Sequence, residues 1–175
     1  SDRLINDRRP FNGIEERLHW AKLPHGTMLI QLIVDKGQGV RGSGDDLSSY
    51  FNTLEHLRAW RGRNVVGTPF DGGRYENFGG VKGNMYMLGF VVVCMGDSNA
   101  VDIAQLTHES ALRRCDCLRD TEILRYGEVF PSGRCLEGLY IDDHIVILVH
   151  ENRRIRKLSY LPICQPLHSP VSPAK

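Results

Sequence analysis

The chain has 175 residues, of which 41% are hydrophobic and 25% charged, a composition typical of one globular domain rather than of a disordered chain. Its formal net charge of +1 provides no overall field that would attract a nucleic acid. Any such binding must come from local basic clusters, at Arg8-Arg9, residues 58–63 and residues 153–157. Taken singly, each of these clusters is explained more simply as a solvated face.

The cysteine content and the apolar runs bear on location. Five cysteines without a signal peptide indicate reduced thiols, as in the cytosol or nucleus. The longest apolar run, residues 85–95, is interrupted by Gly89 and is too short for a bilayer, which needs about 20 residues. We therefore expect an intracellular protein, cytoplasmic or nuclear, with no membrane partner.

A zinc site is one reading of the cysteines. Cys115 and Cys117, with His108 and Cys135 nearby, supply suitable ligand types, although their spacing fits no standard zinc motif.

The first half of the chain predicts three elements. Residues 27–34 (TMLIQLIV) form a β-rich apolar run and predict a strand. Residues 37–44 contain four glycines and predict a loop. Residues 46–60 predict a helix, because apolar side chains recur there at three- and four-residue spacing, at Leu47, Tyr50, Phe51, Leu54 and Leu57.

The middle of the chain predicts a loop or hairpin, a strand and a helix. Residues 66–83 hold six glycines and one proline, and so predict a loop or hairpin. Residues 86–94 (YMLGFVVVC) predict a buried strand. Ser98 or Asn99 can cap a helix that runs to about residue 117, with candidate buried positions at Val101, Ala104, Leu106 and Leu112.

The last structured segment predicts a hairpin. Residues 139–141 and 145–149 are apolar and flank Asp142-Asp143, which would form an acidic tip. The basic and then Pro- and Ser-containing tail, residues 153–175, is expected to be partly disordered. Because strands and helices do not alternate regularly, the predicted fold class is α+β.

Two acidic pairs are candidate metal ligands. Asp142-Asp143 lies at the tip of an apolar hairpin, where carboxylates are costly without a cation, although Asp also suits an ordinary turn. Asp45-Asp46 follows the glycines and could equally be an N-cap. Together the pairs offer the oxygen ligands that Mg²⁺ prefers. Two such ions, about 4 Å apart, activate a hydroxyl and stabilise a leaving pyrophosphate.

Four separated segments resemble the reverse transcriptases. Tyr140-Ile141-Asp142-Asp143 resembles the YxDD box of the palm hairpin. Residues 46–51 (DLSSYF) are similar to the first palm box, in which an aromatic residue follows the catalytic Asp by five positions. Residues 95–100 (MGDSNA), with Gln105 nine residues after the glycine, are similar to the box that supports template and nucleotide. Arg3 and residues 7–12 (DRRPFN) resemble the fingers segment.

The resemblance covers residues 1–150 and implies a domain plan. It implies an antiparallel, palm-like sheet with helices packed on one face, together with part of the fingers. Residues 1–40 would be a fingers-edge segment, residues 41–152 the palm-like reverse transcriptase core, and residues 153–175 the tail. The implied protein is an RNA-directed DNA polymerase, a nucleotidyltransferase, from a retroelement.

The resemblance also implies a set of functional residues. Asp46, Asp142 and Asp143 would be catalytic and, with the backbone carbonyl of Leu47, would hold two Mg²⁺ ions, for which Mn²⁺ could substitute. The partners would be an RNA or DNA template with its primer and deoxynucleoside triphosphates. Residues that would contact these substrates are Arg3, Arg9, Phe51, Gly96, Ser98, Gln105 and Tyr140.

Individual roles within this set have alternatives. Arg3 would contact the triphosphate, and Phe51 would exclude a 2′-hydroxyl by its bulk, unless it is a core aromatic. Gln105 and Ser98 would contact the template side, unless Gln105 is a surface helix residue. Asp45 competes with Asp46, because Tyr50 follows Asp45 by five positions.

The sequence departs from the family pattern at three positions. Cys94 and Val101 stand where proline is common, and Asp97 stands where an aromatic or hydrophobic residue is usual. An acid there is unfavourable beside a polyanion. Two alternatives therefore stay open: an inactive polymerase-like remnant that at most binds nucleic acid, and an unrelated small metal-binding or interaction domain. A viral RNA polymerase palm ranks lower, since those usually carry glycine at the position of Tyr140.

Overall fold

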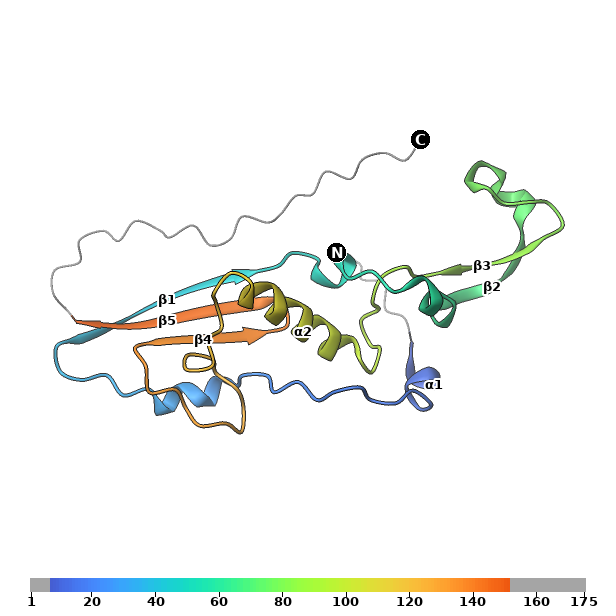
Figure 1. Cartoon of the computed structure of the whole chain (residues 1–175). Coiled ribbons are helices and arrows are strands. Elements are labelled where there is room, and N and C mark those ends of the chain that lie inside the picture. Colours follow the sequence, from blue (N-terminus) through green and yellow to red (C-terminus); the bar gives the residue numbers. More distant parts are fainter. Residues whose placement is uncertain (1–6, 152–175) are drawn as a thin grey trace.

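The structure is a computed structural model and describes residues 7–151. Two antiparallel sheets and one longer α-helix give an α+β fold (Figure 1). The three-stranded sheet has the order β1-β5-β4, and the second sheet pairs β2 with β3. The elements are α1 (Arg9–Asn12), β1 (Gln38–Asp46), β2 (Val65–Asp71), β3 (Met85–Gly89), α2 (Ala100–Arg113), β4 (Cys135–Tyr140) and β5 (Asp143–Glu151), with the 3₁₀ helices η1 (Gly26–Gln31), η2 (Tyr50–Thr53), η3 (Arg58–Arg63) and η4 (Gly72–Phe78).

The predicted acidic hairpin is the central part of the fold. β4 and β5 pair antiparallel, with Tyr140 opposite Asp143. Leu136 and Leu139 are both fully buried, and because they are three positions apart they point to opposite faces of the sheet. The hairpin is therefore packed on both faces, which accounts for its nearly continuous apolar sequence.

Residues 37–44 form a strand, so the predicted loop is wrong. β1 pairs with β5 along its whole length, from Gln38 opposite Glu151 to Asp46 opposite Asp143. A Cβ atom on Gly39 would come within 3.0 Å of the His150 ring, so this glycine gives room for its cross-strand neighbour. Pairing with an apolar strand overrides the low strand propensity of the glycines.

The strand predicted for residues 27–34 is also wrong. The chain there forms η1, and the His25 side chain accepts a hydrogen bond from the backbone N–H of Thr27 at its start. Met28, Leu29 and Leu32 of the segment cover the face of the sheet opposite α2, whereas Ile30 and Ile33 are exposed. The first three belong to a core of Met28, Leu124 and Leu136, against which Leu29, Leu32, Phe130 and Ile147 pack.

The helix predicted for residues 46–60 is replaced by two short 3₁₀ helices, η2 and η3. Between them the backbone of Leu54 and His56 bonds to Val93 and Val91, with Val93 N–H to Leu54 O at 2.8 Å and His56 N–H to Val91 O at 2.8 Å. A backbone held by a second segment cannot make the bonds of an α-helix. Even so, Tyr50 and Leu54 are buried as the spacing indicated, whereas Leu57 is 71% exposed.

The middle of the chain forms the two-stranded sheet. The predicted hairpin is present, with β2, η4 and β3 in succession. The predicted buried strand at residues 86–94 is wrong in extent and largely in burial, because β3 ends at Gly89 and its Met87 and Leu88 are 44% and 57% exposed. This sheet extends away from the rest of the fold in Figure 1, and η3 supplies its main contact.

The predicted helix at residues 98–117 is present as α2, with Asn99 at its N-cap position. The Asn99 side chain does not cap the helix; it accepts from Leu18 N–H at 2.8 Å and donates to Glu16 O at 3.1 Å. Of the four predicted buried positions, Ala104 and Leu112 are buried, Val101 is half-buried and Leu106 is exposed. Three polar side chains are buried on α2 as well: Asp102, Gln105 and His108.

Asp102 fastens the segment of residues 17–21 along α2. Its carboxylate is 1% exposed, accepts from Arg17 Nε at 2.9 Å and accepts from Ala21 N–H at 2.8 Å. The two hydrogen bonds compensate the burial of the charge. Arg3 and the tail of residues 153–175 lie outside the described residues.

The buried His56 predicts a pH dependence of stability. Burial lowers its pKa below 6.5; Arg8 acts in the same direction, while Asp97 and Glu15 oppose it. The unfolded chain therefore binds the proton more readily than the folded one. The stabilisation from neutral His56 is complete above pH 6.5 and is lost as the pH falls through the lower folded value.

We expect that the free energy of unfolding, measured with urea from about pH 8 to about pH 5, falls less steeply in His56→Phe than in the wild type. The exposed His19 supplies the control, and His19→Phe should keep the wild-type slope. Equal slopes in the wild type and His56→Phe would contradict the interpretation.

Candidate functional site

The two acidic pairs lie at one end of the three-stranded sheet. β1 ends at Asp46, directly opposite Asp143, the first residue of β5. Beyond the ladder the backbone N–H of Leu47 donates to the carbonyl of Asp142 at 3.2 Å. The backbone pairing thus brings together two acidic segments that are far apart in the sequence.

The register sorts these acids by face. Cross-strand partners lie on the same face of a sheet, so Asp46 accompanies Asp143, and Asp45 accompanies His144. All four border a hollow of about 400 Å³, together with Tyr140, which is 49% exposed. Since Asp45 and Asp46 both line the hollow, its geometry does not choose between them.

The turn that carries Asp142 is held by α2. Ile141 has a φ of 59°, in the left-handed region, which costs about 1–2 kcal/mol for an ordinary L-residue. Gln105 accepts from Ile141 N–H at 2.8 Å and donates from Nε2 to Leu139 O at 2.9 Å. His108 donates from Nδ1 to Ile141 O at 2.8 Å. Three hydrogen bonds from one helix therefore stabilise an unfavourable backbone conformation.

Gln105 has a different position from the one implied by the resemblance. It is 5% exposed, and both atoms of its amide are bonded to the hairpin. In this structure it supports the acidic turn from behind and presents no group to a template. His108 was missed as a functional residue; burial lowers its pKa, so it is held neutral with its proton on Nδ1. Its position three residues after Gln105 and four before Leu112 was the available signal.

The aromatic pair after β1 packs against the same helix. The Tyr50 hydroxyl donates to Ala104 O at 2.9 Å. Burial, with the charge of Asp142, raises the pKa of Tyr50 to about 12. Phe51 is half-buried and packs against the cluster of Tyr50, Leu54, Val93, Ala100 and Ala104. Phe51 therefore has packing contacts and also an exposed part.

The segments DRRPFN and MGDSNA are bound to each other. Asn12 donates to Gly96 O at 2.8 Å and accepts from Ser98 N–H at 3.0 Å. Arg8 donates to Asp97 at 3.3 Å, and both side chains are largely buried. Asp97, the unfavourable acid of the sequence comparison, is thus compensated by a buried arginine. Gly96 and Ser98 are held by their backbones in this contact.

The predicted basic clusters are only partly available. Arg8 is 3% exposed and is bonded to Arg63 O, Glu15 and Asp97, so it is not a surface cation. Arg9 is exposed and forms two hydrogen bonds to Asp7, which lower the pKa of that carboxyl to about 2. The cluster at residues 153–157 lies outside the described residues.

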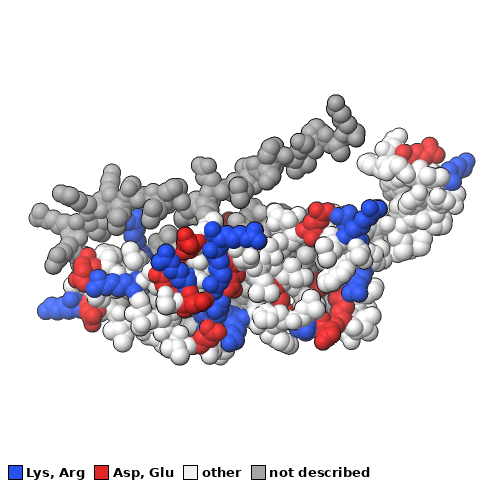
Figure 2. Space-filling view, in the orientation of Figure 1, with Lys and Arg blue, Asp and Glu red and all other residues white. Residues whose placement is uncertain are grey.

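The surface charges of both signs are interspersed on the face shown in Figure 2. The ion pairs of the described residues include a network in which Glu109 contacts Arg113 and Arg125, and both arginines contact Asp120. Among the described helices, none is long and apolar enough to cross a membrane.

The cysteines and histidine that the sequence offers as one reading of a zinc site do not form one close group in the described part of the chain. Within residues 7–151, the one group of three or more potential metal-binding side chains with donor atoms within 4.8 Å is Glu122, Cys135 and Glu137. It includes Cys135 but not Cys115, Cys117 or His108. The carboxylates at the end of the sheet do not form so close a group.

A comparison with protein-family models found no match, and neither did a comparison with curated proteins. The geometry of the chain is therefore the basis for interpreting the site.

The two hydrogen bonds between Gln105 and the hairpin, here called the brace, predict that truncation of the Gln105 side chain lowers stability. Gln105→Ala leaves the buried Leu139 carbonyl and the Ile141 N–H without partners, so we expect the free energy of unfolding to fall by about 1–3 kcal/mol. Thr107→Ala, which removes an exposed hydrogen bond on the same helix, should change it much less. Urea denaturation measures both values, and equal losses would argue against the brace.

Proposed function

We propose that this protein performs template-directed nucleotidyl transfer of the reverse transcriptase type, with two Mg²⁺ ions at the acidic end of the three-stranded sheet. The observation that carries the proposal is the antiparallel pairing of Asp46 with Asp143, which places Asp142 at the adjoining turn. The α+β fold, with α2 packed on one face of an antiparallel sheet, is compatible with a polymerase palm. An origin in a retroelement belongs to the same proposal.

The donor set at this end of the sheet suits a hard divalent cation. Asp46 and Asp143 are exposed and Asp142 is half-buried, so their oxygens are accessible. In residues 7–151 none of the three carboxylates forms a salt bridge, which leaves their charge for a cation. Carboxylate and carbonyl oxygens are the ligands that Mg²⁺ takes, and Mn²⁺ binds to similar sets.

The proposed reaction joins a primer to a nucleotide. The 3′-hydroxyl oxygen of the primer attacks the α-phosphorus of a deoxynucleoside triphosphate, and the bond to the leaving pyrophosphate breaks. When bound, two metal ions lower the pKa of the hydroxyl and neutralise the pyrophosphate. Asp46, Asp142 and the Leu47 carbonyl would hold the ions, and Asp143 would assist. Positioning by the chain supplies much of the remaining rate enhancement.

The supporting network connects all four segments of the resemblance. Arg8 and Asn12 bind the loop at residues 96–98, which leads into α2. α2 in turn holds the YIDD turn through Gln105 and His108. The YIDD turn contacts the segment that begins at Asp46. A rigid support of this kind is what a two-metal site requires, because misplacement by about 1 Å can cost a hundredfold in rate.

Removal of the Asp142 charge tests the site. In Asp142→Asn we expect weaker Mn²⁺ binding at the acidic end, as measured by electron paramagnetic resonance. We also expect primer extension with Mg²⁺ to be lost, because the amide keeps the shape of the side chain but not its charge. The exposed Asp35 gives a matched control, and Asp35→Asn should behave as the wild type. Mn²⁺ binding that is unaffected by Asp142→Asn would refute the metal site. Wild-type binding without any primer extension would favour an inactive remnant.

Phe51 distinguishes exclusion of a 2′-hydroxyl from simple packing. We expect Phe51→Val to admit ribonucleotides in primer extension while deoxynucleotides are still used, because truncation opens space beside the sugar. Truncation of a fully buried phenylalanine to alanine lowers the free energy of unfolding by about 3–5 kcal/mol. Phe51 is only half-buried, so Phe51→Val should lower it by less. Unchanged discrimination, together with a larger loss of stability, would assign Phe51 to the core alone.

A further inference from the structure

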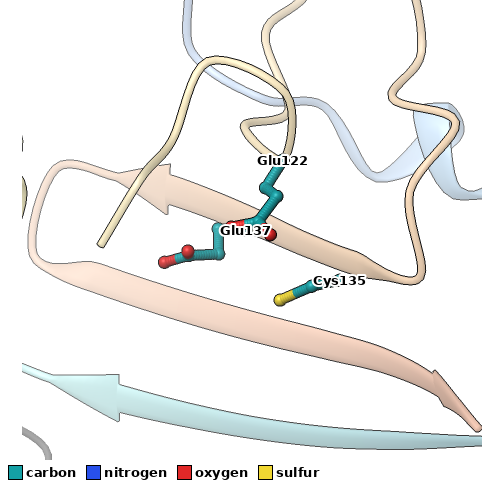
Figure 3. Close-up of side chains that lie close together, drawn as sticks. All are labelled: Glu122, Cys135 and Glu137. Carbon is teal, nitrogen blue, oxygen red and sulfur yellow. The ribbon is translucent and has the colours of Figure 1, made fainter. Parts of the chain in front are cut away.

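A second cluster of potential ligands lies along β4, apart from the acidic end of the sheet. Cys135 and Glu137 are two positions apart on β4 and so point to the same face. Glu122 reaches them from the loop that follows α2, and Figure 3 shows its carboxylate beside that of Glu137, with the Cys135 sulfur close by. The three donor atoms all lie within 4.8 Å of one another.

Backbone pairing fixes this arrangement. Glu137 N–H donates to Glu122 O at 2.8 Å, and Leu124 N–H donates to Glu137 O at 2.7 Å. These bonds hold the Glu122 segment beside β4 as an additional parallel bridge. The side chains therefore meet because backbone hydrogen bonds hold the Glu122 segment against β4.

The charge of Glu137 is compensated by hydrogen bonds and not by an ion pair with a lysine or arginine. Glu137 is 6% exposed and accepts from Leu118 N–H at 3.1 Å, while its other oxygen contacts His144 Nε2 at 2.9 Å. Within the described range no Lys or Arg forms a salt bridge with Glu122 or Glu137. A cation bound among these groups would remove the repulsion between the two carboxylates and favour the thiolate.

We propose that Glu122, Cys135 and Glu137 bind a divalent transition metal of the Zn²⁺ class, separate from the ions at the acidic end of the sheet. The donor types select this class. A thiolate is a poor ligand for Mg²⁺ or Ca²⁺, and two carboxylates are poor ligands for Cu⁺, whereas Zn²⁺ accepts both. Three protein ligands leave a fourth position for solvent. His144 would orient the Glu137 carboxylate from behind, as a hydrogen-bonded partner of a ligand commonly does.

Such an ion would tie the loop after α2 to β4. Through Glu137 and His144 it would also connect to β5, one residue from Asp143. The metal would therefore stabilise the part of β4 and β5 that carries the acidic end of the sheet. This inference is drawn from the cluster itself and does not rest on the proposed polymerase activity.

Cobalt supplies a direct test, because Co²⁺ replaces Zn²⁺ and gives a near-ultraviolet absorbance when it binds a thiolate. We expect the metal-free full chain to bind one equivalent of Co²⁺ with this absorbance, Zn²⁺ to displace it, and Zn²⁺ to raise the Tm. Cys135→Ser should abolish the absorbance. Glu122→Gln should weaken Co²⁺ binding at least about tenfold. Loss of a residue that merely supports a metal ligand already costs about that much affinity, and Glu122 is proposed as a ligand itself.

Two controls separate this site from its neighbours. Cys115→Ser, at an exposed thiol outside the cluster, should keep the absorbance, and so should Asp142→Asn at the acidic end. Circular dichroism establishes that each variant is folded before titration. Failure of the folded wild type to bind Co²⁺ stoichiometrically would overturn the proposal, and so would an absorbance that survives Cys135→Ser but disappears in Cys115→Ser.

Discussion

The hydrogen bonds from α2 to the turn between β4 and β5 are the contact on which the candidate site depends. Gln105 hydrogen-bonds to the Leu139 carbonyl and the Ile141 N–H, and His108 hydrogen-bonds to the Ile141 carbonyl. A buried backbone polar group without a partner costs about as much as a lost hydrogen bond. The helix and the hairpin therefore specify each other's position, and the place of Asp142 follows from both.

The same contact explains how distant parts of the chain act on the acidic end. Before α2, Asn12 and Arg8 fix the loop that leads into the helix. Beside it, Asp102 fastens the chain at Arg17 and Ala21. Arg8 and Asp102 are buried polar side chains, and Asn12 is half-buried. Polar networks of this kind are costly when incomplete, and so they select one arrangement of the core.

The sequence predicted the elements whose local pattern and tertiary role agree. α2 has helical periodicity and a cap position at Asn99, and the acidic hairpin has two apolar strands, so both were found. β1 was missed because its glycines carry no strand signal and its pairing partner is far along the chain. The segment at residues 27–34 was misassigned as a strand because it is apolar. A 3₁₀ helix that packs against a sheet needs apolar side chains just as a strand does, so the pattern does not distinguish the two.

The sequence indicated the acidic residues of the candidate site but not the residues that hold them in place. The sequence predicted that the two Asp pairs share a cation; the sheet places both pairs at one end, and the cation stays a prediction. The choice between Asp45 and Asp46 depends on strand register, which a single sequence does not give. The burial of Gln105 was hidden because a polar helix residue usually faces solvent. The Glu122 cluster depends on a loop running beside β4, which no local pattern indicates.

The left-handed conformation of Ile141 has a consequence for the order of folding events. Two-residue hairpins usually close early from local contacts, in about 1–10 μs, and favour glycine or asparagine where φ is positive. Here a β-branched residue occupies that position, and its compensating bonds come from a helix that is distant in sequence. We therefore expect the hairpin to gain its native turn when α2 docks. The acidic end of the sheet then belongs to the late, long-range stage of folding, and its assembly time reflects the search between the two segments.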